Sequence, residues 1–315
     1  MGADAARAAE TVTRRLDAPG MTAKTLPCEA SDWVRVTVSL LVCFSLLFMG
    51  SAAMAQNQST KVEDGLDAAE QDRKQHKQLL DILTAENGTN PTAIVGRFQL
   101  SNTYRNLAKG AERNDTTFRI DLPVTPNWLL RADVSAGWVE PNQPGISDTF
   151  GVNDLFLRTA WRVYQSPDFS LLVGADAIFP TATDTQLGRG KYEIGPGMAA
   201  SVPIPSLKST LLSVAQHFVS VGGDPSRPDV DFSALQFQLN TVWSKEWWTL
   251  LEGDLNVDWT RGAKTGAVFE GEVGRRFGHH WRAWVRPGAG LWGQDVRGTY
   301  DWSVQLGIRY MFYVY

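Results

Sequence analysis

The sequence predicts an all-β protein, a transmembrane up-and-down antiparallel β-barrel of about twelve strands behind a short N-terminal helical or disordered segment. Three observations predict this fold. Apolar and polar residues alternate in most of the chain after residue 93, the predicted connections are alternately short and long, and aromatic residues gather near the predicted strand ends. Strands that face lipid on one side and water on the other produce this pattern.

Residues 1–55 are expected to be a signal peptide. The apolar run Val36–Met49 is too short to span a bilayer as a helix, and Ala53-x-Ala55 fits cleavage before Gln56. Met21 is an alternative start, and an uncleaved anchor is the alternative to cleavage. Both cysteines, Cys28 and Cys43, lie in this segment, so the mature chain would have no disulfide or thiolate.

Residues 56–92 are expected to form a polar periplasmic segment. Leu66–Leu83 has weak helical character, and Asn87-Gly88 would end the helix. Two interpretations remain open: a periplasmic tail, or a plug that enters the barrel. The short and weak apolar stripe favours the tail.

Residues 93–315 are expected to form the barrel. In the clearest strand, one face holds Leu130, Ala132, Val134, Ala136 and Trp138, and the other holds Arg131, Asp133, Ser135 and Gly137. An even number of strands would put both chain ends on one side. The expected strands are Ile94–Tyr104, Thr116–Val124, Leu129–Trp138, Asp154–Tyr164, Phe169–Phe179, Lys191–Val202, Thr210–Val221, Phe232–Trp243, Trp248–Trp259, Ala267–Phe277, Trp281–Leu291 and Tyr300–Phe312.

The connections indicate how the barrel is oriented. Every second connection is a short turn, such as Thr125–Asn127 or Gly278–His280, whereas Val139–Asn153 and Pro180–Gly190 are longer. Outer-membrane barrels have short periplasmic turns and longer external loops, so the N-terminus is expected on the periplasmic side.

Aromatic residues are expected to form two interfacial bands, because rings with an apolar body and a polar edge favour the headgroup layer. The periplasmic band would contain Trp128, Trp161, Phe169, Trp243, Phe277, Trp281, Tyr310 and Phe312, and the outer band Trp138, Phe179, Trp259, Trp292 and Trp302. The last strand also resembles the signal that the outer-membrane assembly machinery recognises, through Gln305, Gly307, Tyr310 and Phe312, although Tyr313–Tyr315 follow it.

Several stretches resemble the MetA-pathway of phenol degradation family of outer-membrane proteins. They are Gly151-Val152-Asn153-Asp154, Phe179-Pro180-Thr181 leading into Leu187-Gly188-Arg189-Gly190, and Asn256-Val257-Asp258-Trp259, in that order. The resemblance runs from about Phe98 to the C-terminus. It implies a small barrel that passes hydrophobic or aromatic compounds, and it carries over no catalytic residue.

The inward face is expected to be charged, because an Arg or Lys facing lipid at the bilayer midplane costs about 2–4 kcal/mol. Folding at the turns would place Glu272 opposite Arg286, Glu252 opposite Glu272, and Asp254 opposite Glu270. One wall would then be acidic and its neighbour basic, forming either a salt-bridged filling or a polar eyelet. The candidate residues of the solute path are Arg158, Arg162, His217, Glu252, Asp254, Glu270, Glu272, Arg282, Arg286 and Arg309.

No enzyme, metal or cofactor is expected. The chain has four histidines, and His217 is the one candidate base in the lumen, with Ser213 on the same face. The adjacent pair His279-His280 would point to opposite faces and lacks metal-ligand spacing. The net charge of −4 gives no indication of nucleic-acid binding.

The function expected from these features is a channel or transporter in the outer membrane of a Gram-negative bacterium. It would pass small, hydrophobic or aromatic solutes by passive diffusion. Its expected partners are outer-membrane lipids, the assembly machinery and the solute. The alternatives are a structural or adhesive barrel with a closed lumen, and an outer-membrane hydrolase.

Overall fold

The structure is a computed structural model that describes residues 63–312, all within the compact unit Thr60–Tyr315. The expected signal peptide, its cleavage site and Tyr313–Tyr315 lie outside the described residues. Within the described range, the helix α2 (Glu63–Asn87) precedes the strands. The strands are β1 (Gly96–Asn106), β2 (Glu112–Thr125), β3 (Trp128–Glu140), β4 (Thr149–Val152), β5 (Leu155–Gln165), β6 (Ser170–Phe179), β7 (Lys191–Ile204), β8 (Ser209–Gly223), β9 (Asp231–Val242), β10 (Trp247–Asp258), β11 (Lys264–Phe277), β12 (Trp281–Trp292) and β13 (Trp302–Phe312).

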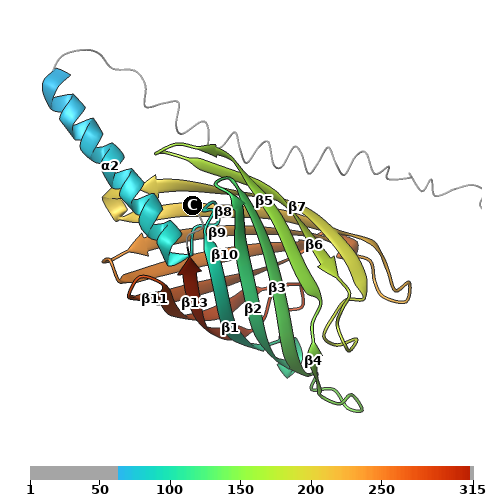
Figure 1. Ribbon diagram of the computed structural model, residues 1–315. Coiled ribbons are helices and arrows are strands. Elements are labelled where there is room, and N and C mark those ends of the chain that lie inside the picture. Colours follow the sequence, from blue (N-terminus) through green and yellow to red (C-terminus); the bar gives the residue numbers. More distant parts are fainter. Residues whose placement is uncertain (1–62, 313–315) are drawn as a thin grey trace, which may run out of the picture. The chain divides into compact units, whose positions relative to one another are not determined.

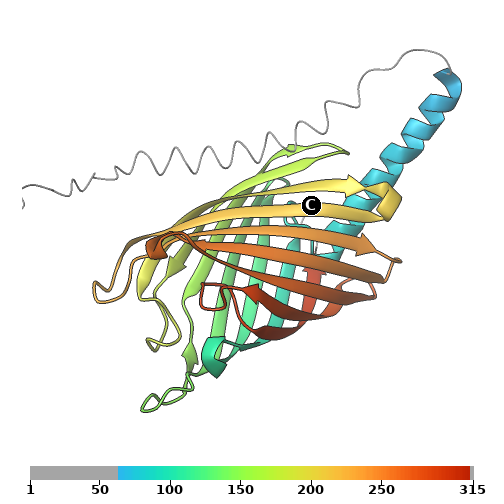
Figure 2. The same cartoon turned by 180° about the vertical axis from the view of Figure 1, so that it is seen from behind.

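These strands form one closed antiparallel sheet (Figures 1 and 2). Apart from β4 and β5, consecutive strands pair with one another, and β1 pairs with β13 from Gly96↔Phe312 to Asn106↔Trp302, which closes the barrel. Both β4 and β5 pair with β3. They therefore occupy one strand position between them, and the barrel has the twelve positions that the alternation predicts.

The predicted alternation is confirmed by exposure. In β10, Leu251 is 47% exposed whereas its neighbour Glu252 is 4% exposed. Large apolar side chains cover the outer face of the barrel, and polar and charged side chains face inward. Exposed members of the outer set include Phe98, Leu100, Phe118, Leu122, Val134, Phe269, Val273, Leu306 and Ile308. A soluble protein rarely exposes so continuous an apolar surface, whereas lipid covers it at no cost.

Of the helices in the described part of the chain, none is both long and apolar enough to cross a membrane.

The two ends of the barrel differ in their connections. At one end, called the short-turn end, tight connections join β2 to β3 and β11 to β12, and β1 begins and β13 ends there. At the other end, called the long-loop end, residues 141–148, 180–190, 224–230 and 293–301 form longer loops. One difference from prediction is at Tyr300, which lies in the last loop and not in β13.

The lumen is densely packed toward the short-turn end. Trp248 and Met311 are fully buried there, and Leu129 is nearly so. Glycines on neighbouring strands make room for two lumenal indole rings. A Cβ atom at Gly307 would lie 2.0 Å from Cζ2 of Trp284, and one at Gly274 would lie 2.0 Å from Cζ2 of Trp248. The short-turn half of the barrel is therefore filled by side chains.

Candidate functional site

Residues 84–92, called the inner segment, lie inside the short-turn end of the barrel. Thr84 is fully buried, and Asn87, Asn90 and Thr92 are nearly so. The Thr92 hydroxyl lies 3.0 Å from the Ser201 hydroxyl of β7. Beyond the segment, Ile94 packs against the lumenal apolar side chains Ala160, Leu172, Ala199 and Val214. The last turn of α2 and the residues after it therefore contact several walls of the barrel.

Three arginines hold the inner segment by its backbone. Arg282 Nε donates to the Glu86 carbonyl at 2.7 Å, and Arg309 donates to the Asn87 carbonyl at 2.8 Å. Arg97 donates to the Gly88 carbonyl at 2.7 Å. The last carbonyls of a helix have no partner within the helix and carry partial negative charge, so cations there satisfy and stabilise them.

Two of these arginines were predicted to form a basic wall beside the acidic one. Instead, Arg282 also donates to the His279 carbonyl, and the Arg309 guanidinium lies 3.9 Å from the centre of the Trp284 ring. Arg309 keeps a distant ion pair with Glu272 at 3.7 Å. Both side chains are therefore engaged with the inner segment and the short-turn end, and the predicted acidic wall does not face a free basic one.

Arg286 is the centre of the acidic cluster on β10 and β11. It contacts Glu272 at 2.6 Å, Glu252 at 3.0 Å and Glu270 at 3.3 Å. The predicted proximity of Glu272 and Arg286 is present. One guanidinium thus neutralises part of a group of three carboxylates, each at most 18% exposed.

The predicted register between β10 and β11 was wrong by two residues. Glu252 lies opposite Glu270, not Glu272, and Asp254 lies opposite Val268. The reason is the turn: a 3-10 helix over Trp259–Arg261 ends at Gly262, which has a positive φ of 69°. This turn centres the hairpin on Arg261 instead of Gly262.

The wall formed by β1, β2, β3, β5 and β6 is also ion-paired. Asp121 is shared by Arg97 and Arg131, and Arg158 pairs with Asp176 at 2.6 Å. Arg119 and Asp133 form a bidentate pair with a shortest contact of 2.7 Å. The carboxylates of this wall are nearly buried, so charge is balanced locally rather than left to a mobile ion.

Two predicted path residues lie elsewhere. Arg162 donates to the Pro126 carbonyl and the Asn127 side chain, so it braces a turn at the short-turn end. His217 alternates with Phe218, which lies in the lumen, so the His217 side chain is on the opposite face of β8. Here its polarity did not indicate its face, because β8 carries small or apolar residues on both sides.

His217 has polar neighbours of its own on that face. Its Nδ1 lies 2.9 Å from Ser233 Oγ, and its Nε2 lies 3.5 Å from Asp231. Ser233 Oγ also accepts a hydrogen bond from the Trp259 indole at 2.9 Å. Ser213 is the predicted companion of His217, but the serine that His217 contacts is Ser233.

The residues of the predicted assembly signal are all in β13. Gln305 donates to Thr103 at 2.9 Å, and Gly307 lies beneath the Trp284 ring. Tyr310 contacts Trp281, with ring centroids 5.0 Å apart, and Phe312 stacks on Phe98. These contacts explain the residue types structurally, and recognition by the assembly machinery stays a prediction.

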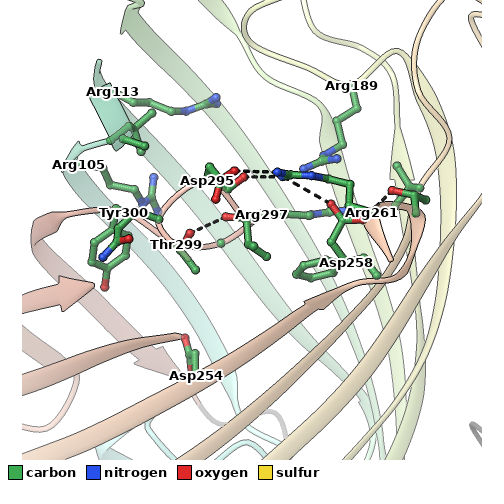
Figure 3. A pocket seen from close by; sticks show the side chains of 18 of the residues that line it. Arg105, Arg113, Arg189, Asp254, Asp258, Arg261, Asp295, Arg297, Thr299 and Tyr300 are labelled. Atoms are coloured by element: carbon green, nitrogen blue, oxygen red, sulfur yellow. Dashed lines mark hydrogen bonds and ion pairs between the residues drawn. The ribbon is translucent and has the colours of Figure 1, made fainter. Parts of the chain in front are cut away.

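A cavity of about 1110 Å³, called the vestibule, opens at the long-loop end (Figure 3). Arg105 and Arg113 lie on one side of it, and Arg189 and Arg261 lie on the other. Asp254 and Glu270, two of the predicted path residues, also line it. Two of the predicted path residues therefore line a cavity whose other walls come from both strands and loops.

Residues 293–301, called the crossing loop, fold into this cavity from between β12 and β13. Val296 is buried against Phe218, Val230 and Phe232 of the opposite wall. Arg297 pairs at 2.6 Å with Glu193 of β7, a strand far from β12 in the sheet order. These contacts can be made only across the lumen, so the loop narrows the barrel.

The base of the crossing loop is tied to the rim. Asp295 accepts from Arg261 at 2.7 Å and from Lys264 at 2.6 Å. The hydrogen bonds from Lys264 and Arg261 hold the pKa of the Asp295 carboxyl well below its usual range. Strand alternation does not predict that this loop enters the lumen; the closely spaced Gly293 and Gly298, both with positive φ, are the local signal of its sharp turns.

The described residues offer no metal centre. Among residues 63–312, no group of three or more His, Cys, Asp or Glu side chains is placed to hold a metal ion. The expectation that the protein uses no metal or cofactor stays a prediction.

Comparisons with known proteins support the fold. No protein-family model matches the sequence. No curated protein is similar to it at a significant level. Among solved structures, the chain is similar to the COG4313 outer membrane channel from Pseudomonas putida F1, with a TM-score of 0.56 and 13% identity over 69% of this chain and 94% of that one. It is also similar to the NanC porin, with a TM-score of 0.50 and 8% identity over 68% of this chain and 98% of that one. At identities this low, the comparison shows a similar barrel fold and nothing more.

Proposed function

We propose that this protein is an outer-membrane channel that passes small solutes by passive diffusion. The observation that carries the proposal is the closed barrel itself, apolar outside and charged inside, with a vestibule of about 1110 Å³ at one end. A channel needs polar groups along its interior to replace the hydration shell of a solute. The channel and the porin that share the fold support this function.

The proposed location is the outer membrane of a Gram-negative bacterium, reached with a signal peptide cleaved before Gln56. The apolar outer face and the aromatic residues at its borders support insertion into lipid. Exposed ring side chains at the short-turn end include Trp161, Trp243, Phe277 and Trp281, and those at the long-loop end include Trp292 and Trp302. With short turns on the periplasmic side, the vestibule would open to the outside of the cell.

The proposed solutes are small hydrophobic or aromatic compounds, as the resemblance to the MetA-pathway of phenol degradation family implies. The vestibule combines apolar side chains, such as Phe232 and Val296, with charged ones, such as Arg297. Such a mixed lining suits solutes that carry both an apolar body and a polar group.

The inner segment is proposed to act as a plug at the periplasmic end. Its contacts with Arg97, Arg282 and Arg309 hold it across the narrow, packed half of the lumen. In that position it restricts the pore, so the conductance of the intact protein is expected to be small. A fully closed lumen is the structural alternative.

The decisive experiment is single-channel recording in planar bilayers with the refolded mature protein. A closed barrel should migrate differently on gels before and after boiling, and only preparations that pass this check are used. Discrete current steps of small conductance support the channel. A silent bilayer with correctly folded protein favours a structural or adhesive barrel.

We propose that the protein is not an enzyme. One observation favours the hydrolase alternative, namely the contact of His217 with Ser233 and Asp231. An ester-hydrolysis assay on protein in detergent tests it, with Ser233→Ala as the matched variant. Activity that disappears in that variant would establish a hydrolase.

A further inference from the structure

A second cavity, of about 470 Å³, lies at the long-loop end and is called the arginine cavity. Its lining, within the described residues, contains four arginines, Arg113, Arg189, Arg227 and Arg297, but only two carboxylates, Asp154 and Glu193. Two positive charges are therefore in surplus on its walls. Around Arg286, by contrast, three carboxylates surround one guanidinium.

Neither carboxylate balances the cluster. Glu193 is fully buried and is shared by Arg297 at 2.6 Å and Arg189 at 3.8 Å. The carboxylate of Asp154 accepts from the backbone amides of Ala182 at 3.2 Å and Arg189 at 2.8 Å. It is thus engaged in shaping the loop over residues 180–190.

Among the described residues, neither of the other two arginines, Arg113 and Arg227, has a carboxylate of its own. Arg113 donates to Asp115 at 2.8 Å, but Arg105 binds the same oxygen at 2.8 Å. Arg227 donates to backbone carbonyls, including those of Thr185 at 2.8 Å and Gly188 at 2.7 Å. Carbonyl oxygens orient a guanidinium without neutralising it.

Arg189 lies close to a like charge, that of Arg297. Its side chain is 43% exposed, and its ion-pair contact with Glu193 is long, at 3.8 Å. Burial, and next the nearby Arg297, lower the pKa of Arg189 to about 10, so the group stays charged at neutral pH. A guanidinium with this exposure can turn toward a solute in the cavity.

The cavity also has an apolar side, formed by Ile178, Leu187 and Pro228. Arg297 is fixed above it by the rings of Phe218 and Phe232, at 5.3 and 4.9 Å from their centres. A planar guanidinium held in one orientation matches the two oxygens of a carboxylate. The arginine cavity is thus lined by both guanidinium groups and apolar side chains.

We propose that the arginine cavity binds a small monocarboxylate with an apolar body as it enters the pore. This inference deepens the proposed function and rests on it, because the site lies at the outer mouth of the channel. The carboxylate would take the place of the missing counter-charge between Arg189 and Arg297, and its apolar body would lie against Leu187 and Pro228.

The test is calorimetric titration of the folded protein in detergent at low ionic strength, with hexanoate as the probe. Hexan-1-ol has the same chain without the charge, and acetate has the charge without the chain. Hexanoate should bind, and both other compounds should bind at least about tenfold more weakly. Equal binding of hexanoate and hexan-1-ol would overturn the proposal.

Two variants with opposite expected effects make the test specific. Arg189→Gln should weaken hexanoate binding by roughly tenfold, because a charged contact is lost. Glu193→Gln should strengthen it, because the competing carboxylate is removed while an oxygen acceptor for Arg297 remains. Arg275→Gln is the control: this arginine is paired with Glu246 at the short-turn end, and the variant should bind hexanoate as the unaltered protein does.

The outcomes separate this inference from the proposed function, because binding is measured without current. A protein that conducts in bilayers but binds hexanoate no better than hexan-1-ol refutes the anion site and leaves the channel. A protein that binds hexanoate as predicted but never conducts supports the site and refutes the channel. An affinity unchanged by Arg189→Gln would also refute the site.

Discussion

The short-turn end and the long-loop end of this barrel use arginine in different ways. At the short-turn end, Arg97, Arg282 and Arg309 donate to the backbone carbonyls of residues 86–88. At the long-loop end, Arg189, Arg261 and Arg297 contact the side-chain carboxylates of Glu193 and Asp295 around open space. The first arrangement fixes a chain segment in the lumen, and the second leaves charge exposed to a solute.

In the proposed channel, this difference would make the short-turn half the narrow part of the pore and the long-loop half the part that selects the solute. Packed indole rings and the inner segment fill the short-turn half, whereas the vestibule occupies the long-loop half. The narrow end would limit the flow, and the charged wide end would decide which solutes reach it.

Removing the inner segment should have the largest effect. Deleting residues 57–92 from the mature protein should raise single-channel conductance several-fold, because the lumen loses a segment that contacts several of its walls. The matched variant removes residues 294–300 of the crossing loop and should raise conductance less. Equal increases in the two deletions would mean that the ends restrict the pore alike.

Of the single substitutions, Arg286→Gln should lower the free energy of unfolding most. Replacing Arg286 by Gln leaves Glu252, Glu270 and Glu272 together without their shared cation, and breaking a buried pair in this way costs about 3–5 kcal/mol. The urea concentration at which the unboiled gel mobility is lost reports the change. Arg275→Gln, which removes an exposed pair, should cost only about 0–1 kcal/mol.

One added carbon in the packed short-turn half should lower the free energy of unfolding. In Gly307→Ala the new methyl would lie 2.0 Å from the Trp284 ring, so ring or strand must shift at a cost of about 1–3 kcal/mol. Gly253→Ala is the control, because nothing lies within 4 Å of its added Cβ. If both variants unfold at the same urea concentration as the unaltered protein, the short-turn half is not tightly packed.

The tie at the base of the crossing loop should be insensitive to mild acid. Because the folded-state pKa of Asp295 is depressed, its contribution is present above the ordinary aspartate pKa of about 4 and is lost as the pH falls through the folded value. A fluorophore on Gln294→Cys should therefore keep its anisotropy from pH 7 to pH 5. Asp295→Asn with the same label should be more mobile at both values, and a marked change in the unaltered loop over this range would contradict the assigned pairing.

The sequence predicted the strands and much of the inward charge well, and the physical reason is local. Alternation with period two is set within each strand, so Glu252, Glu272 and Arg286 could be placed on the inward face directly. The 3-10 turn at Trp259–Arg261 shifted one register, because turn length cannot be read from alternation. The face on which His217 lies was predicted incorrectly, because β8 has small residues on both faces and its sequence does not show which face is outward.

The period-two alternation could not predict where the loops and the inner segment lie. Arg297 and Val296 are positioned by Glu193, Phe218 and Phe232, which are distant in the sequence and meet only when the barrel closes. The inner segment likewise has little apolar periodicity. Hydrogen bonds from arginines to its backbone carbonyls hold it, and an apolar pattern does not reveal such contacts.

In the proposed channel the pore is open, wide at the vestibule and narrow at the inner segment. Polymer exclusion in planar bilayers measures these widths: polyethylene glycols of increasing size are added to one side of an oriented channel, and the size that no longer lowers the conductance is recorded. The conductance should be small, and the cut-off size should be larger from the long-loop side than from the short-turn side. Equal cut-offs from the two sides, or folded protein without any conductance, would contradict this arrangement of the pore.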